Sequence, residues 1–329
     1  MTAPAVETHD LVREYKGGVR AVDGVTLTVG SGGIFGFLGP NGAGKSTTVR
    51  MLTTLLRPTA GTARVAGHDV QENPDAVRRR IGVALQDAAI DPYMTGRELL
   101  RLQGVLHGLP RAECRARADD LLDRVGLEDA ADRRVGTYSG GMRRRLDLAL
   151  SLVHEPVVLF LDEPTTGLDP TSRVALWEEV RRLNREHGTT IFLTTQYLEE
   201  ADRLAQRIAV IDRGVVIAEG TPAELKARVG GEGLEVAVVE PGDLERARTI
   251  VSRVASDEVF VDPERRRVRA AVADGPRALA DVAGQIAAEG ILTEDVGLHR
   301  PTLDEVFLAL TGRPAEDDDG AAAMDEGSG

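Results

Sequence analysis

The chain has 329 residues, 42% of them hydrophobic, and a formal net charge of -13, so it is long enough for one large domain and a smaller one. The acidic balance argues against a nucleic-acid partner, because phosphate backbones are bound by basic surfaces, and the single cysteine, Cys114, excludes an internal disulfide. The longest comparable apolar run, Val157 to Leu161, is far shorter than the roughly 20 residues that span a bilayer, and residues 1–10 lack the apolar stretch of a signal peptide.

The first part of the chain predicts strands that lead into a glycine-rich loop. Residues 11–38 are typical of short strands separated by turns, and Ile34 to Leu38 is apolar almost without interruption. A strand that is apolar on both faces is typical of the centre of a parallel sheet covered by helices. It runs directly into Gly39 to Thr47, after which we expect a helix to about Leu56.

The segment from Gly39 to Ser46, called the phosphate loop below, fits G-x-x-x-x-G-K-[ST] at every fixed position. Its glycines let backbone amides approach phosphate oxygens, and the helix that follows directs its positive N-terminus at the anion. A glycine-rich turn with a chance lysine is the alternative, but lysine is scarce in this chain. The predicted nucleotide-binding residues of the loop are Gly39, Pro40, Asn41, Gly42, Ala43, Gly44, Lys45, Ser46 and Thr47. We expect Lys45 to bind the β- and γ-phosphates and Ser46 to bind Mg²⁺.

Further along, helices give way to alternating strands and helices. The stretch from Met94 to Leu127 has helical periodicity, whereas strand character returns at Val157 to Leu161, Thr190 to Leu193 and Ile208 to Ile211. Alternation of this kind predicts an α/β fold with a parallel sheet. The guanine-recognition motif Asn/Thr-Lys-x-Asp is absent, which favours ATP over GTP as the nucleotide.

A pair of carboxylates, Asp162 and Glu163, follows the apolar strand that begins at Val157. The carboxyl end of a strand is where an α/β sheet places its ligand-binding groups. We therefore expect Asp162 to hold Mg²⁺ and Glu163 to polarise the attacking water.

The composition changes near Gly230 to Gly233, where we predict a linker. Residues 231–312 then predict the order β-α-β-β-α-β, typical of a ferredoxin-like module, followed by a helix at Leu303 to Leu310. Residues 313–329 are acidic, and we expect a disordered tail there.

The segment Tyr138-Ser139-Gly140-Gly141-Met142 resembles the Leu-Ser-Gly-Gly-Gln signature of ABC ATPases, and the resemblance extends over residues 8–228. It implies a P-loop NTPase domain over residues 1–230, with a RecA-like core and a helical subdomain at about 87–150. The run Tyr138 to Leu146 and the ending Leu303 to Gly312 resemble the daunorubicin-resistance type of bacterial drug exporter ATPase. The resemblance makes residues 231–312 an accessory domain that regulates hydrolysis, strengthens a dimer or holds a permease.

Several functional residues are implied by this resemblance. Gln86 matches the loop that senses Mg²⁺ and the γ-phosphate, and Asp169 matches the loop that crosses the dimer interface. Tyr15 lies where the family stacks an aromatic ring on adenine, although an ordinary core tyrosine is the alternative. Further implied nucleotide ligands are Ser139, Gly140 and Gly141, and the implied metal ligands are Ser46, Gln86 and Asp162.

One residue departs from the family pattern. Gln196 stands where the family usually has a histidine, and glutamine keeps an N–H donor but carries no titrating proton. The predicted catalytic residues are Glu163 as base, Gln196 and Lys45, with hydrolysis retained.

The resemblance also implies partners: a second copy of the chain, whose signature would close over the γ-phosphate, and a separate membrane permease. We expect the protein at the cytoplasmic face of a bacterial membrane, with the helical insert around 87–135 contacting the permease through a groove at Asp91 to Met94. The alternatives are a non-transport ABC ATPase of translation or DNA repair, which usually has two cassettes, a coiled coil or a zinc module, and a soluble P-loop kinase, which the signature argues against.

Overall fold

A computed structural model describes residues 3–85, 90–228, 233–299 and 302–312. These residues form two compact units that divide between Thr221 and Pro222. Residues 230–232 of the expected linker and the whole expected tail lie outside the described residues, as does Gln86. None of the helices in the described part of the chain combines the length and apolar character of a membrane-spanning segment.

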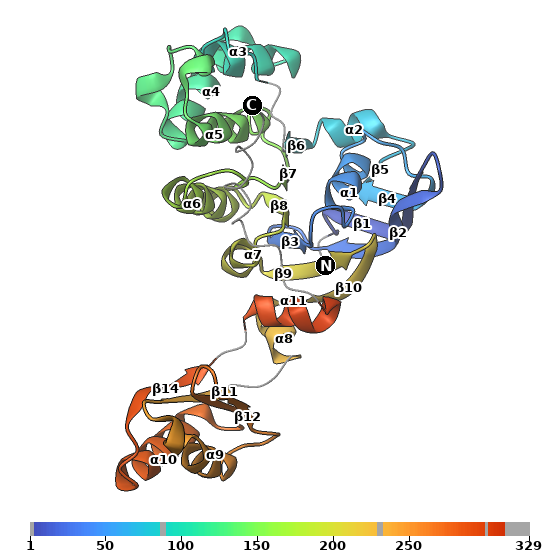
Figure 1. Ribbon diagram of the computed structural model, residues 1–329. Helices are drawn as coiled ribbons and strands as arrows, with labels where there is room; N and C mark the ends of the chain where they lie inside the picture. Colours follow the sequence, from blue (N-terminus) through green and yellow to red (C-terminus); the bar gives the residue numbers. More distant parts are fainter. Residues whose placement is uncertain (1–2, 86–89, 229–232, 300–301, 313–329) are drawn as a thin grey trace, which may run out of the picture. The chain divides into compact units, whose positions relative to one another are not determined.

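The first unit is built on a six-stranded sheet with the order β10-β9-β3-β8-β7-β6 (Figure 1). Its central strand β3 (Ile34–Leu38) is buried throughout and pairs in parallel with β8 and β9, which confirms the predicted central strand. The other strands are β6 (Ile81–Ala84), β7 (Val158–Asp162), β8 (Thr190–Thr195), β9 (Arg207–Asp212) and β10 (Val215–Gly220).

A second, antiparallel sheet in the same unit has the order β2-β1-β4-β5. Its strands are β1 (Val6–Tyr15), β2 (Val19–Val29), β4 (Ala60–Val65) and β5 (His68–Asp69). The expectation of short strands over residues 11–38 was wrong for β1 and β2, which are 10 and 11 residues long. Asp10 and Gly24 have positive φ, and register shifts between Thr8 and Leu11 bend the pair without ending it.

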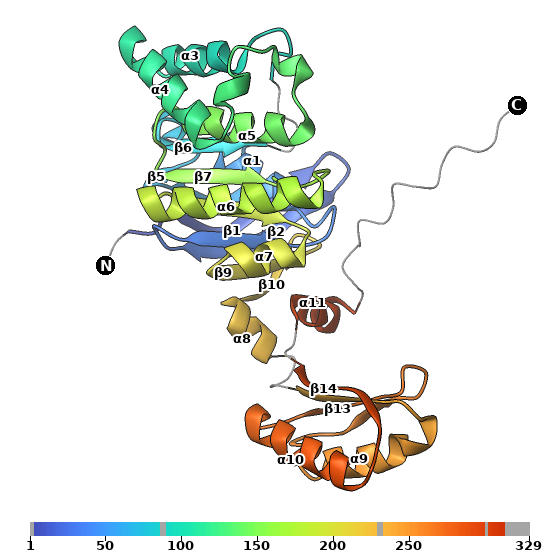
Figure 2. The same cartoon turned by 90° about the vertical axis from the view of Figure 1, so that its left-hand side faces the viewer.

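Four helices pack close to the strands of the first unit: α1 (Lys45–Leu52), α2 (Pro74–Arg78), α6 (Pro170–His187) and α7 (Leu198–Leu204). Three others gather beyond the β6 end of the sheet: α3 (Gly96–Leu106), α4 (Arg111–Arg124) and α5 (Gly140–Ser151) (Figures 1 and 2). The helix expected to reach Leu56 ends at Leu52, because Thr53 bonds back to Val49 and Thr54 adopts a left-handed φ of 65°.

Hydrophobic side chains from alternate positions of the strands fill two clusters, one on each face of the six-stranded sheet. Phe192 of β8 anchors one of them, with ring centroids of Phe35, Phe37 and Phe160 at 5.4–5.6 Å. These rings bring β3, β7 and β8 into register, and the strand ends that carry polar residues therefore meet at one edge of the sheet.

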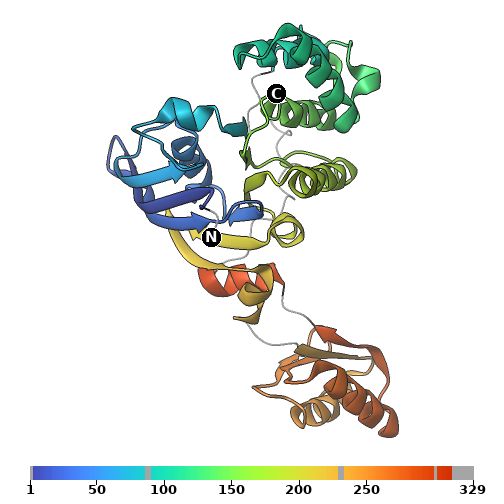
Figure 3. The same ribbon diagram turned by 180° about the vertical axis from the view of Figure 1, so that it is seen from behind.

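The second unit has its own antiparallel sheet, with the order β12-β13-β11-β14, and its own hydrophobic cluster. Helices α9 and α10 cover one face of this sheet (Figures 2 and 3). The elements follow the expected β-α-β-β-α-β order: β11 (Gly233–Val238), α9 (Leu244–Ser252), β12 (Phe260–Asp262), β13 (Arg267–Ala271), α10 (Gly275–Ala288) and β14 (Thr293–His299). Helix α8 (Pro222–Ala227) packs against the terminal helix α11 (Leu303–Thr311).

Candidate active site

The phosphate loop connects the carboxyl end of β3 to α1, and two of its glycines are required by the backbone. Gly44 is the N-cap of α1 with a left-handed φ of 104°, and a Cβ there would lie 2.3 Å from the Ala21 carbonyl oxygen. A Cβ at Gly39 would lie 2.3 Å from the carbonyl oxygen of Ile211. A side chain at either position would displace the loop. The motif therefore requires glycine at these two positions because other backbone segments pack closely against them.

Lys45 is buried, with an exposed fraction of 3%, and its ammonium group lies inside the loop. Lys45 Nζ donates to the carbonyl oxygens of Gly39 at 2.7 Å and Pro40 at 3.0 Å, and it lies 3.0 Å from Glu163 Oε1. The structure thus brings together the predicted phosphate-binding lysine and the predicted base. A buried cation needs partners of this kind, and a phosphate group can replace them.

Asp162 and Glu163 stand at the end of β7, and Thr194 of the neighbouring strand β8 orients both. Ser46 Oγ donates to Asp162 Oδ1 at 3.2 Å, and the Thr194 hydroxyl donates to the same oxygen. Thr194 Oγ1 also accepts the backbone N–H of Glu163 at 3.1 Å. Glu163 has a left-handed φ of 49°, a strained conformation that persists only where neighbours hold it.

This donor set fits a magnesium ion. Mg²⁺ prefers oxygen ligands and is usually held by one or two protein groups together with phosphate oxygens and water. The Ser46 hydroxyl and the buried Asp162 carboxylate already lie within hydrogen-bond distance of each other, beside the loop that would hold the phosphates.

Arg144 of α5 reaches the same region from the helical part of the unit. Its guanidinium donates to the carbonyl oxygens of Asp162 at 2.9 Å, Glu163 at 3.0 Å and Pro164 at 2.8 Å, and to Leu85 at 2.6 Å. It also pairs with Asp147, whose carboxyl pKa is raised to about 6 by burial, an effect that Arg144 opposes. One side chain therefore ties α5 to the loop that carries Asp162 and Glu163 and to the residue preceding Gln86.

Two other predicted residues have distinct surroundings. Gln196 follows the end of β8, and its Oε1 is buried without a hydrogen-bond partner among the described residues. An orphaned buried oxygen at this position is suited to bind a water molecule. Tyr15, at the end of β1, is 38% exposed and has the Arg13 guanidinium 4.9 Å from its ring centroid.

The signature segment lies at the start of α5. Ser139 is the N-cap, and its Oγ accepts the N–H of Met142 at 3.2 Å, as the sequence predicts. Ser139 and Gly140 are exposed, and in the described chain no hydrogen bond joins them to the phosphate loop. Asp169 is likewise exposed and caps α6, and hydrogen bonds from Ser172 hold its pKa below the ordinary value.

Sequence reasoning missed two residues of the site. Thr194 lies one residue beyond the predicted strand Thr190 to Leu193 and was given no role, although its position at the end of that strand, two residues before Gln196, was an available signal. Arg144 lies in a run of three arginines, Arg143 to Arg145, which looked like part of an ordinary capped helix. Its partners at residues 85 and 162–164 become neighbours only in the folded chain.

Comparisons with known proteins decide the family. A family model described as ABC transporter matches residues 22–166. A daunorubicin resistance ATP-binding protein of Streptomyces coeruleorubidus is 52% identical over 316 residues, covering 96% of this chain and 98% of that protein. The chain belongs to the ABC transporter ATP-binding proteins.

Two further similarities indicate which type of ABC protein this chain is. A daunorubicin/doxorubicin resistance ATP-binding protein of Streptomyces peucetius is 51% identical, covering 98% of this chain and 97% of that protein. The solved ATP-binding cassette MJ0796, a dimer in a post-hydrolysis state bound to ADP and Pi, matches with a TM-score of 0.61 and 26% identity, covering 66% of this chain and 98% of that one. The ABC protein described here is therefore of the daunorubicin-resistance type, binds ATP and hydrolyses it.

Proposed function

We propose that the chain powers export of a drug or another hydrophobic compound through a separate bacterial permease, at the cytoplasmic face of the membrane. The support is the near full-length similarity to proteins whose names assign them daunorubicin or doxorubicin resistance. One feature of the structure carries the ATPase part of the proposal: the buried Lys45–Glu163 pair lies beside the Ser46–Asp162 hydrogen bond.

We assign roles to these residues as follows. Lys45 leaves its internal partners to bind the β- and γ-phosphates, and Glu163 accepts a proton from the attacking water. Gln196 orients that water through its side-chain amide, and Thr194 holds the backbone of Glu163 in place. Mg²⁺, held by Ser46 and Asp162 together with Gln86, would neutralise phosphate charge when bound.

We also propose that the catalytic unit is a homodimer. The N-terminus of α5 presents exposed Ser139 and Gly140 with free backbone amides, a favourable site for an anion. Because these groups make no hydrogen bond to the phosphate loop of their own chain in the part that the structure describes, the γ-phosphate they contact would belong to the second copy. Tyr15 would stack on adenine, and Asp169 would lie at the interface.

The permease would dock on the helical part of the first unit. Tyr93 is 79% exposed in the segment Asp91 to Met94 that we expected to form the groove, and α3 exposes Leu102, Val105 and Leu106 at 44%, 53% and 72%. Exposed apolar groups gathered in this way mark interaction surfaces. Residues 231–312, which lie within the second unit, would form a ferredoxin-like accessory domain.

Substitution of Glu163 by Gln tests the proposed catalytic role. We expect ATP turnover to fall by about a hundredfold or more, because the amide cannot accept the proton, while ATP-dependent dimers accumulate. Glu178→Gln makes the same change at an exposed position of α6 and should leave both measurements unchanged. ATP turnover is measured with the permease present. Unchanged turnover of Glu163→Gln, together with loss of activity in Gln196→Ala, would contradict the assignment of Glu163 as the base and Gln196 as the group that orients the water. A variant that stays monomeric with saturating Mg-ATP would contradict the dimer.

A further inference from the structure

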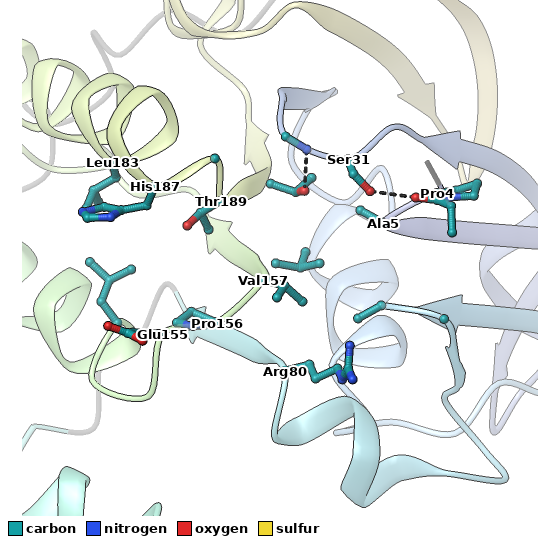
Figure 4. Close-up of a pocket in the computed structure, with 18 of the residues that line it drawn as sticks. Pro4, Ala5, Ser31, Arg80, Glu155, Pro156, Val157, Leu183, His187 and Thr189 are labelled. Carbon is teal, nitrogen blue, oxygen red and sulfur yellow. Dashed lines mark hydrogen bonds between the residues drawn. The ribbon is translucent and has the colours of Figure 1, made fainter. Parts of the chain in front are cut away.

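A cavity of about 580 Å³ lies in the first unit away from the nucleotide site. It is lined by the residues that begin β7 and β8, whereas Asp162 and Thr195 stand at the opposite ends of these strands. Figure 4 shows Val157 at the start of β7 and Leu183 on α6 among the lining side chains. Small-molecule pockets usually measure roughly 300–1,000 Å³, so the cavity can take a compound of ordinary ligand size.

The wall of this cavity contains an apolar side chain that is only half covered. Val157 is 48% exposed, although its neighbours Pro156 and Val158 are both buried. Leu121 of α4 and Leu183 of α6 line the same space. An apolar ligand bound there would bury Val157, which is exposed to water in the unliganded chain, and this burial would favour binding.

The charged groups around the cavity differ in whether they are already paired. Arg117 pairs with Glu155, and Arg124 Nη1 donates to His187 Nε2 at 2.6 Å while its Nη2 lies 3.0 Å from Asp120. Arg80, which comes from the turn between α2 and β6, is exposed, and its backbone carbonyl accepts the N–H of Val157, but its guanidinium has no hydrogen bond or ion pair within the described parts of the chain (Figure 4). Its guanidinium is therefore available to an anion.

We propose that this cavity is a second ligand-binding site, which takes a small amphipathic anion. The apolar body contacts Leu121, Val157 and Leu183, and the single acid group binds Arg80. A cationic ligand is disfavoured, because Glu155 carries the only carboxylate that lines the cavity among the residues that the structure describes, and it is already paired with Arg117. Occupancy is independent of ATP, because the nucleotide groups stand at the other ends of β7 and β8.

The test is a fluorescence titration of the full-length chain with 8-anilinonaphthalene-1-sulfonate in saturating Mg-ATP. N-phenyl-1-naphthylamine has the same rings without the sulfonate and reports the apolar contribution alone. Three variants are compared: Arg80→Glu, Val157→Phe, which fills the cavity, and Arg79→Glu, which makes the same charge change at an exposed neighbour outside the lining. ATP turnover of each variant confirms that the fold is retained.

We expect one saturable sulfonate site per chain, weakened at least about tenfold by Arg80→Glu and less than about twofold by Arg79→Glu. Val157→Phe should weaken both probes, whereas Arg80→Glu should leave the neutral probe unchanged. Competition with 1-naphthoate and 1-naphthyl phosphate shows whether a carboxylate or a phosphate is preferred. The proposal is overturned if ATP displaces the sulfonate probe, if the two arginine variants behave alike, or if neither acid competes.

Discussion

Arg144 gives this ABC protein a direct connection between its two functional segments. The residue belongs to the helix that begins at the signature, yet its guanidinium binds the backbone of the loop that carries Asp162 and Glu163. Because the signature would act on the nucleotide of a second copy, a shift of α5 would also displace Glu163, the proposed catalytic base of the same chain. A planar guanidinium with five N–H donors can bind several backbone carbonyls at once in a fixed geometry, whereas an ammonium group cannot.

Replacement of Arg144 by Lys should therefore slow the chemical step more than it weakens ATP binding. We expect kcat to fall at least about tenfold with KM for ATP changed by less than about threefold, because small displacements of a catalytic group are costly while the phosphate loop is untouched. Arg143→Lys is the matched control, since the side chain of that exposed arginine makes a single hydrogen bond among the described residues, to the Tyr138 carbonyl. An increase in KM at constant kcat, measured by steady-state kinetics, would show that Arg144 serves binding.

The site residues that belong to short contiguous motifs could be predicted from the sequence, whereas those that act through distant residues could not. The phosphate loop and the pair Asp162–Glu163 are short contiguous motifs, and the structure brings Lys45 and Glu163 together as expected. Thr194 and Arg144 act through residues far away in the sequence, so their roles follow only from strand pairing and helix packing.

Between helices α6 and α7, a buried carboxyl group replaces the usual apolar contact. Trp177 Nε1 donates to Glu200 Oε1 at 2.9 Å, and the Glu200 side chain is wholly buried. Burial raises the pKa of Glu200 above its ordinary value of 4.5, an effect that the Thr195 hydroxyl and the Trp177 indole oppose. The folded chain therefore holds this proton more tightly than the unfolded chain does.

The sign of this shift predicts a pH-dependent loss of stability. The contribution of Glu200 is fully present below pH 4.5 and is lost as the pH rises through its raised pKa. Glu200→Gln keeps an oxygen acceptor for Trp177 but cannot ionise, so its Tm relative to the native chain should increase from pH 5 to pH 8. Glu199→Gln, at an exposed position next to it, should show no such trend. Equal Tm differences at both pH values would show that Glu200 ionises in the folded state as it does in the unfolded state.

The elements themselves were predicted best where burial is complete. Strands β3, β7 and β8 are buried at every position, and each contains an apolar run that is easy to find: Ile34 to Leu38, Val158 to Leu161 and Ile191 to Leu193. The C-terminal end of α1 and the length of β1 and β2 were missed, because they depend on single left-handed residues such as Thr54 and Asp10. Backbone conformation at one residue leaves little trace in hydrophobic periodicity.

At the scale of the whole molecule, the chain consists of two units with separate hydrophobic clusters. The glycine-rich segment near residue 230 was expected to begin the second domain, but the second compact unit begins at Pro222. The reason is that α8, the helix that directly follows the first unit in sequence, packs against the terminal helix α11 and therefore belongs to the second unit. Leu225 of α8 and Phe307 of α11 are both buried, with exposed fractions of 0% and 2%.

Two truncated chains of similar length should consequently differ in how readily they aggregate. A chain of residues 1–221 should unfold cooperatively and bind ATP, because it keeps both hydrophobic clusters of the first unit. A chain of residues 1–230 retains α8 without α11, which leaves Leu225 exposed, and it should aggregate more readily in sedimentation experiments. The ATP turnover and dimerisation of the 1–221 chain then report what the second unit contributes: faster turnover indicates that the unit restrains hydrolysis, weaker dimers that it supports the interface. Equal aggregation of the two truncations would mean that α8 does not need α11.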